Sequence, residues 1–131
     1  MKQEMALMCI AGAGLCLITA CVPVQPYNSE GMIKVSYINY SGNSNFEPIN
    51  TPKPRFPMSL YGKEDEGDCK MRFDVTPMGK PVNIKAVNCS HVGFKMASIL
   101  SIKELRYPLP HQQGDPVFVE GVEYNIKFLV Q

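Results

Sequence analysis

The sequence has few histidines, and it lacks the catalytic motifs that many enzymes share. It has two histidines, and it shows no nucleophile elbow around a Ser, Cys or Thr, no glycine-rich phosphate loop and no His-Glu-x-x-His zinc motif. The acidic run at residues 64–68 lacks the alternating ligands of a calcium loop, so it is typical of a solvated turn. We therefore expect no enzyme activity, no cofactor and no metal site.

The chain also lacks an excess of charge of either sign. Its 131 residues include 13 Lys plus Arg and 12 Asp plus Glu, which gives a formal net charge of +1. This balance provides no field that would attract nucleic acid, and the 45% content of hydrophobic residues is too high for a disordered chain. The length permits one small domain, and no internal repeat is visible.

The N-terminal segment has the pattern of an export signal. No charged residue occurs from Met5 to Val24, and the run Ile18-Thr19-Ala20-Cys21 resembles a bacterial lipobox. We predict that residues 1–20 are a signal peptide and that Cys21 is lipidated, which would anchor the protein on the periplasmic side of an envelope membrane. The alternative is an uncleaved N-terminal helix in the inner membrane, because about twenty apolar residues can span a bilayer.

Residues 21–54 have the composition of a linker. Six of the eleven prolines lie between Val22 and Pro57, among many Asn and Ser residues. The segment Met32–Tyr40 is β-prone, so it is either a strand that docks on the domain or an apolar patch in a disordered tether. We favour the tether.

Residues 55–131 form the predicted domain, because the hydrophobic period changes there from two to about 3.6 and back to two. The pattern predicts a strand over 69–75, a turn, a return strand over 82–86, a helix from Ser90 to about Leu105, and a last strand from Val119 or Val122 to Val130. The predicted fold is α+β, a three-stranded antiparallel sheet with one helix packed on it.

The predicted helix has an apolar face that should contact the sheet. Its expected inner residues are Val92, Phe94, Met96, Ala97, Ile99, Leu100, Ile102 and Leu105. Its expected outer residues are Lys95, Ser98, Ser101 and Lys103.

Cys69 and Cys89 are expected to form a disulfide, because the leader predicts a location outside the cytoplasm and the predicted core is small. A metal site of Cys69, Cys89 and His91 is the weaker alternative, since no fourth Cys or His lies nearby. If Met71 pairs with Ala86, direct pairing of the two cysteines needs one extra residue in the second strand. We therefore predict a β-bulge around Val87-Asn88.

These residues resemble, in order and spacing, the C-terminal domain of the TonB family of periplasmic energy transducers. The resemblance covers residues 54–131 and is carried by Arg55-Phe56-Pro57, Glu66-Gly67, Met71, Phe73, Val75, Gly79, Val82, Ile84, Ser90, Phe94, Ala97, Arg106-Tyr107, Pro110, Gly114 and Val119. Leu105 stands where the family usually has an aromatic residue, and a lipobox replaces the family's signal anchor.

The resemblance implies a protein that binds outer-membrane transporters by β-strand addition in energy-coupled transport. The candidate edge is the final strand, and the candidate partner-binding residues are Val122, Tyr124, Asn125, Ile126, Lys127 and Phe128. The alternative is an envelope lipoprotein that scaffolds a complex without transducing energy, because acyl chains cannot contact an inner-membrane motor as a helix can.

The lipid anchor predicts that the Cys21→Ala variant loses its membrane attachment. Mass spectrometry of the membrane-extracted wild type should give the mass of a chain that begins at acylated Cys21. A variant that still fractionates with membranes and keeps its leader would instead support the uncleaved helix.

Overall fold

The computed structural model describes residues 26–42 and 46–130, so the predicted signal peptide and Cys21 lie outside the described residues. Within these ranges, no helix is long and apolar enough to cross a membrane. The elements are β1 (Ile33–Ser36), η2 (Tyr37–Asn39), η3 (Met58–Leu60), β2 (Glu66–Val75), β3 (Pro81–Cys89), η4 (Val92–Phe94), α2 (Lys95–Lys103), β4 (His111–Gln112) and β5 (Asp115–Leu129).

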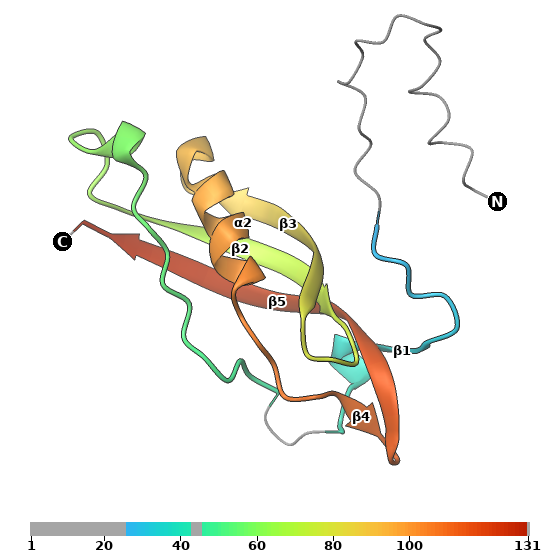
Figure 1. Ribbon diagram of the computed structural model, residues 1–131. Coiled ribbons are helices and arrows are strands. Elements are labelled where there is room, and N and C mark those ends of the chain that lie inside the picture. The colour runs from blue at the N-terminus through green and yellow to red at the C-terminus, as the bar shows by residue number, and fades with distance from the viewer. Residues whose placement is uncertain (1–25, 43–45, 131) are drawn as a thin grey trace, which may run out of the picture.

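The strands form one sheet in the order β1-β5-β2-β3, with α2 packed across one face (Figure 1). β1 runs parallel to β5, whereas β2 is antiparallel to both β3 and β5, and the short β4 pairs with the start of β5. The predicted α+β class and its hairpin, helix and final strand are confirmed. The prediction of three strands omitted β1 and β4.

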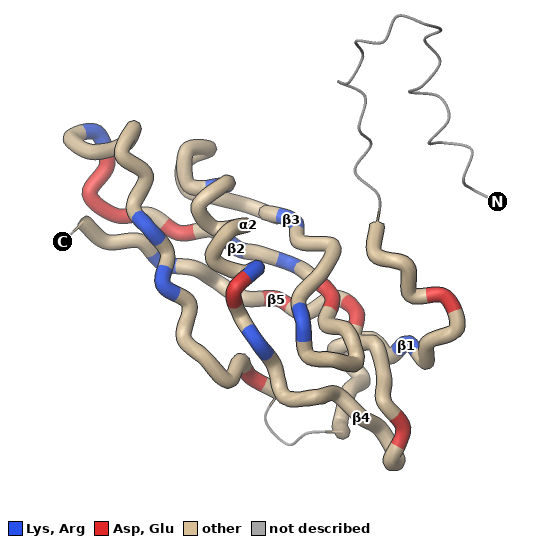
Figure 2. Tube along the Cα trace, in the orientation of Figure 1, with Lys and Arg blue, Asp and Glu red and all other residues tan. Residues whose placement is uncertain are grey.

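The core lies between α2 and the helix-facing side of the sheet. Alternate residues of β2 and β5 point into it, as expected for strands with one face in water. Its largest fully buried side chains are Phe73, Phe94, Phe128, Met71, Ile102, Leu105 and Ile126. The opposite face of β2 and β5 carries exposed residues of both charges: Glu66, Asp68, Lys70, Arg72, Glu123 and Lys127. Figure 2 shows how Lys and Arg alternate with Asp and Glu along the chain.

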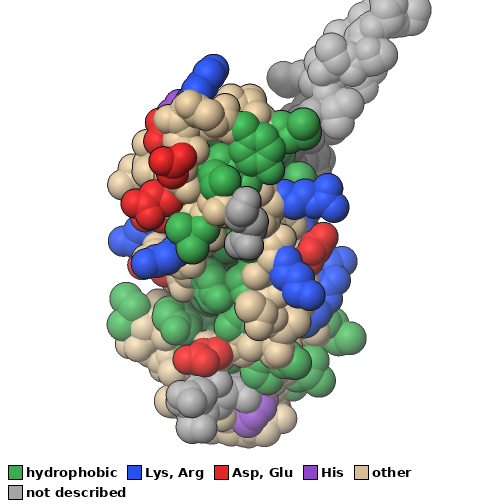
Figure 3. Space-filling model, turned by 90° about the vertical axis from the view of Figure 1, so that its left-hand side faces the viewer, with side chains coloured by type: hydrophobic (Ala, Val, Ile, Leu, Met, Phe, Trp, Pro, Cys, Tyr) green, Lys and Arg blue, Asp and Glu red, His purple; other side chains and the backbone are tan. Residues whose placement is uncertain are grey.

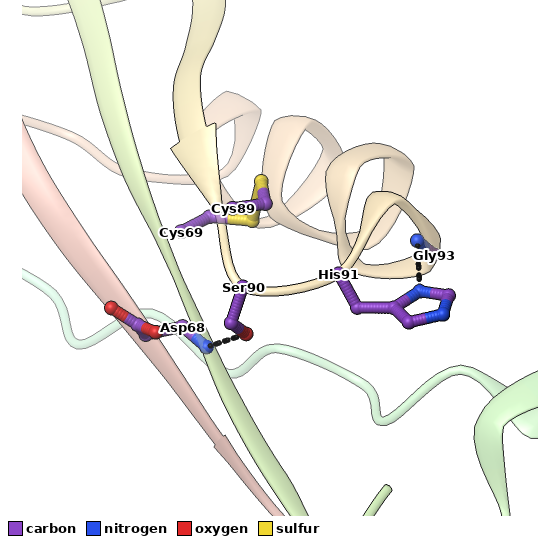
Figure 4. Close-up of a disulfide and its surroundings, with 6 residues drawn as sticks. All are labelled: Asp68, Cys69, Cys89, Ser90, His91 and Gly93. Atoms are coloured by element: carbon purple, nitrogen blue, oxygen red, sulfur yellow. Dashed lines mark hydrogen bonds between the residues drawn. A yellow bond between two sulfur atoms is a disulfide. The ribbon is translucent and has the colours of Figure 1, made fainter. Parts of the chain in front are cut away.

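The β2–β3 hairpin contains the predicted disulfide and the predicted bulge. Cys69 pairs with Cys89 and Lys70 with Asn88, whereas Met71 pairs with Ala86, so Val87 is the extra residue. The bulge turns Cys89 toward Cys69, and the two sulfurs are bonded (Figure 4). Because both thiols are consumed, the metal alternative with His91 is wrong.

The junction between β3 and η4 differs from the prediction at its cap. Ser90 does not cap a helix: its hydroxyl oxygen accepts a hydrogen bond from the Asp68 backbone N–H, 3.0 Å away. The cap is His91, whose Nδ1 accepts a hydrogen bond from the Gly93 N–H at 2.9 Å. In Figure 4 the His91 ring points away from the disulfide. The chain therefore enters a 3-10 turn before the α-helix starts at Lys95.

The inner face of the helix was predicted only in part. Phe94, Ile102 and Leu105 are buried as expected, and Ala97 and Ile99 pack against the core. Ser98 and Ser101, expected outside, are buried. Val92, Met96 and Leu100, expected inside, are between 53% and 76% exposed. The Phe94 ring, which was expected inside, stacks on Phe128 with centroids 4.7 Å apart and fixes the orientation of the helix.

The Phe94 ring lies against Gly67 in β2, where any Cβ would collide with it. With Phe94 directed inward, the positions four, seven and eight residues later face the sheet. These are Ser98, Ser101 and Ile102.

Asp74 in β2 connects two irregular positions of the sheet. Its Oδ1 accepts a hydrogen bond from the Gly121 N–H at 3.0 Å, and its Oδ2 accepts one from Asn83 Nδ2 at 2.8 Å. Gly121 and Asn83 both have positive φ, 78° and 55°, in the strands on either side of β2. One carboxylate thus stabilises a bulge in β5 and an irregular turn of the backbone in β3.

The segment predicted as a tether is docked on the domain. β1 pairs in parallel with Val117–Glu120 of β5, and the Tyr40 hydroxyl oxygen accepts a hydrogen bond from the His111 N–H at 3.1 Å. Upstream, the Tyr27 N–H donates to Asn83 Oδ1 at 2.8 Å and the Tyr27 ring stacks on Phe118. For residues 33–36 the tether prediction is therefore wrong, and the docked strand is correct.

The disulfide predicts a marked loss of stability on reduction. Opening a cross-link between residues 20 positions apart should lower the free energy of unfolding by about 3 kcal/mol. Urea unfolding with and without dithiothreitol measures this difference. The Cys69→Ala/Cys89→Ala double variant is the control, because its stability should be low and insensitive to dithiothreitol.

The position of Asp74 predicts that the Asp74→Ala variant loses about 2 kcal/mol of stability, since a half-buried backbone N–H at Gly121 is left without its acceptor. Asp65→Ala is the matched control: this exposed residue contributes a backbone carbonyl to the fold, so its replacement should cost less than about 0.5 kcal/mol. Equal losses for both variants in urea unfolding would contradict the role of Asp74.

Candidate strand-docking edge

The pairing of β5 with β2 determines which backbone groups of β5 face outward. The Val130 N–H donates to the Asp65 carbonyl at 3.1 Å, just beyond the end of the ladder. Because hydrogen-bonding direction alternates along an antiparallel strand, the even-numbered residues 122–130 face β2. The N–H and C=O groups of residues 123, 125, 127 and 129 therefore point away from the sheet.

This outer side of β5 is an unpaired edge. β1 occupies it only as far as Glu120, just before the bulge at Gly121. Within residues 26–42 and 46–130, no strand pairing or backbone hydrogen bond reaches the outer side of residues 123–129. An unpaired row of this kind is a template for adding another strand.

The predicted partner-binding residues divide between the core and the surface. Val122, Ile126 and Phe128 are at most 2% exposed and support the sheet from its core side. Asn125 and Lys127 are exposed on the solvent face, and Tyr124 is half-buried at the core's margin. What this strand offers a partner is its backbone, together with the side chain of Tyr124.

The coil of residues 46–57 lies beside β5, with residues 46–51 next to Tyr124 and Pro54 and Phe56 next to Leu129. A cavity opens at each of these two places. The first, of about 460 Å³, lies next to Tyr124, and the second, of about 480 Å³, lies next to Leu129. We refer to these as the tyrosine cavity and the C-terminal cavity.

The tyrosine cavity is built from segments far apart in the sequence. Its lining includes Tyr37, Phe46, Glu47, Tyr107, Val122 and Tyr124. Phe46 and Tyr107 form the buried floor, with ring centroids 4.9 Å apart. Tyr37 and Glu47 are more exposed and form the walls.

The C-terminal cavity is more apolar. It is lined by Pro54, Phe56, Tyr61, Gly62, Leu129 and Val130, and the rings of Phe56 and Tyr61 stack with centroids 5.5 Å apart. Apolar side chains gather between charged ones on the side of the molecule where the loop before β2 and the C-terminal end lie (Figure 3).

Glu123 lies at the edge, but its side chain is engaged on the solvent face. Its carboxylate accepts a hydrogen bond from Arg72 at 2.8 Å and lies 3.8 Å from Lys70 Nζ. The Arg72 hydrogen bond, followed by the charge of Lys70, lowers the pKa of Glu123 below its usual value. This carboxylate is therefore paired with Arg72 and Lys70, although Glu123 also belongs to the lining of the cavity beside Tyr124.

Sequence reasoning missed the residues that the N-terminal coil contributes to the edge. Tyr37, Tyr40 and Phe46 fell within the predicted linker, although three aromatic residues in ten positions are unusual for a spacer. They pack together and on Tyr107, with a Tyr40–Phe46 centroid distance of 4.9 Å. Their aromatic content was the available signal.

The fold and this edge define a small mixed α+β domain suited to binding another protein chain. The family model described as Gram-negative bacterial TonB protein C-terminal matches residues 52–129. The chain therefore belongs to the TonB C-terminal family, as the resemblance predicted. This family is associated with the bacterial envelope and contains interaction and energy-transduction domains that contact outer-membrane proteins.

Two solved structures are similar to this chain. The TonB2 protein from Vibrio anguillarum is 18% identical, covers 84% of this chain and 98% of its own, and gives a TM-score of 0.49. The Pseudomonas aeruginosa TonB CTD is 18% identical, covers 77% of this chain and 94% of its own, and gives a TM-score of 0.47. A search of curated proteins gave no match.

Proposed function

We propose that this chain is a TonB-like protein on the periplasmic side of a bacterial envelope membrane that binds an outer-membrane transporter by β-strand addition. The transporter's segment would pair with the outer edge of β5 over residues 123–129, in energy-coupled transport. The observation that carries the proposal is this unpaired edge in a member of the TonB C-terminal family.

The chemistry of the edge suits a partner of variable sequence. In strand addition the affinity comes from main-chain hydrogen bonds, and pockets beside the edge read alternate side chains. β5 offers such groups at residues 123, 125, 127 and 129, and a cavity lies at each end. The edge is also stiffened, because β2 pairs along its whole inner side.

The proposed attachment of the chain includes the lipid anchor at Cys21, with the residues up to about 54 leading to the domain. β1 lies within that segment and shares the outer edge of β5 with the proposed partner. A scaffolding lipoprotein that transduces no energy remains the second candidate, favoured by the lipobox.

Replacing Asn125 or Lys127 by Pro removes one outward N–H and should leave the pairing with β2 intact. We expect each variant to keep the wild-type circular dichroism and to bind the partner at least about tenfold more weakly. The partner is measured by affinity recovery of the full-length protein from native envelopes, followed by mass spectrometry.

Asn125→Thr is the matched control, because it changes the same side chain but keeps the N–H, and it should recover transporters as the wild type does. Recovery that is unchanged in both Pro variants would exclude this edge. The scaffolding function is the correct one if two results are obtained. The recovered partners are envelope proteins other than transporters, and the amount recovered does not change when the proton-motive force is collapsed.

A further inference from the structure

We propose that the strand accepted by β5 carries an arginine or lysine side chain that enters the tyrosine cavity, and a bulky apolar side chain six residues away that enters the C-terminal cavity. This inference rests on the proposed function, because it names the chemistry of the segment that the edge selects.

The walls of the tyrosine cavity favour a cation by their ring faces. Phe46 and Tyr107 form its floor, and Tyr37 and Tyr124 lie at its sides. Aromatic faces carry negative electrostatic potential, so a guanidinium or ammonium group within about 6 Å of them is attracted. The volume of about 460 Å³ is large enough for a long side chain.

The charge of the lining has the sign that a cation requires. Glu47 is exposed at the mouth, and its carboxylate has no salt bridge within the described residues. None of the described lining residues is Lys, Arg or His. Glu123, the other acidic residue of the lining, is paired with Arg72 and Lys70, so Glu47 supplies the charge.

The wall that carries Glu47 is held in place by its neighbours. Asn50 Oδ1 accepts a hydrogen bond from the Arg106 N–H, and Asn50 Nδ2 donates one to the Glu104 carbonyl, both at 2.8 Å. The Ile49 N–H donates to the Arg106 carbonyl at 2.6 Å. These bonds fasten the coil to the end of α2, so the cavity is formed before a partner arrives.

The titration of Tyr107 agrees with this character. Burial, and then the nearby Tyr124, Tyr37 and Glu47, raises the pKa of Tyr107 well above its usual value. Of these neighbours, the Glu47 carboxylate opposes a further negative charge in the cavity, and the same carboxylate attracts a positive one.

The spacing of the two cavities matches one face of an extended strand. From residue 123 to residue 129, β5 rises by about 20 Å, and each cavity lies between one end of this stretch and the coil of residues 46–57. Side chains six residues apart on an added strand point to the same face, because the period is two. One segment can therefore fill both cavities.

Four acetylated and amidated nine-residue peptides test this with the full-length protein. All four consist of threonine and valine except at two positions six residues apart. One of these positions is leucine and the other is arginine or citrulline, and each pair is made in both chain orders. Citrulline has the shape of arginine without its charge. We expect one order to bind, with citrulline weakening binding roughly tenfold.

The Glu47→Gln variant should bind the arginine peptide more weakly by the same factor and should bind the citrulline peptide as the wild type does. Glu30→Gln is the matched control, because Glu30 is an equally exposed carboxylate outside the cavity lining, and it should change neither. Tyr61→Ser, in the C-terminal cavity, should weaken both peptides equally. Circular dichroism confirms that each variant is folded.

The inference would be overturned if the arginine and citrulline peptides bound with equal affinity. It would also be overturned if Glu47→Gln did not change the affinity for the arginine peptide. If Asn125→Pro still abolished binding of both, strand addition at β5 would stand without the cation. Failure of every peptide to bind would also overturn the inference, whereas the proposed function is decided separately by the recovery of transporters from envelopes.

Discussion

The two hydrogen bonds of Asp74 determine where the edge of this domain begins. By accepting from Gly121 in β5 and from Asn83 in β3, the carboxylate holds two left-handed backbone positions that would otherwise have unpaired polar groups. The bulge at Gly121 divides β5 into a part that pairs with β1 and a part whose outer side is unpaired. Asn83 in turn accepts from Tyr27, so the same carboxylate also supports the N-terminal segment.

Local pattern was sufficient for the hairpin and its disulfide. The alternation of β2 and β3 gave the register. If Met71 pairs with Ala86, Cys69 can pair directly with Cys89 only when β3 has one extra residue, and the structure has it at Val87. The helix shows the limit of such reasoning. Phe94, Ile102 and Leu105 were correctly expected inside, but Met96 and Leu100 are exposed and Ser98 and Ser101 are buried. The exact orientation depends on the stacking of Phe94 on Phe128 over Gly67, residues that are far apart in sequence.

The edge itself could be predicted only in part. The family resemblance indicated that the last strand forms the edge. The side-chain pattern does not show which residues of that strand direct their backbone N–H and C=O groups outward, because this depends on which residues bond to β2. The cavities were beyond prediction, since they join Tyr37 and Glu47 from the supposed linker to Tyr107 and Tyr124. Proline and asparagine content indicated a spacer, and the tertiary contacts of its aromatic residues outweighed that composition.

The parallel pairing of β1 with β5 has a mechanical consequence. A pull on the chain before Ile33, resisted by a strand held at residues 123–129, would act along the strand axis. The hydrogen bonds between β1 and β5 would then be loaded together in shear, and they would have to break at once. An antiparallel hairpin pulled from its open end instead unzips one bond at a time. The parallel arrangement therefore suits an N-terminal segment that must carry tension while β1 stays paired with β5.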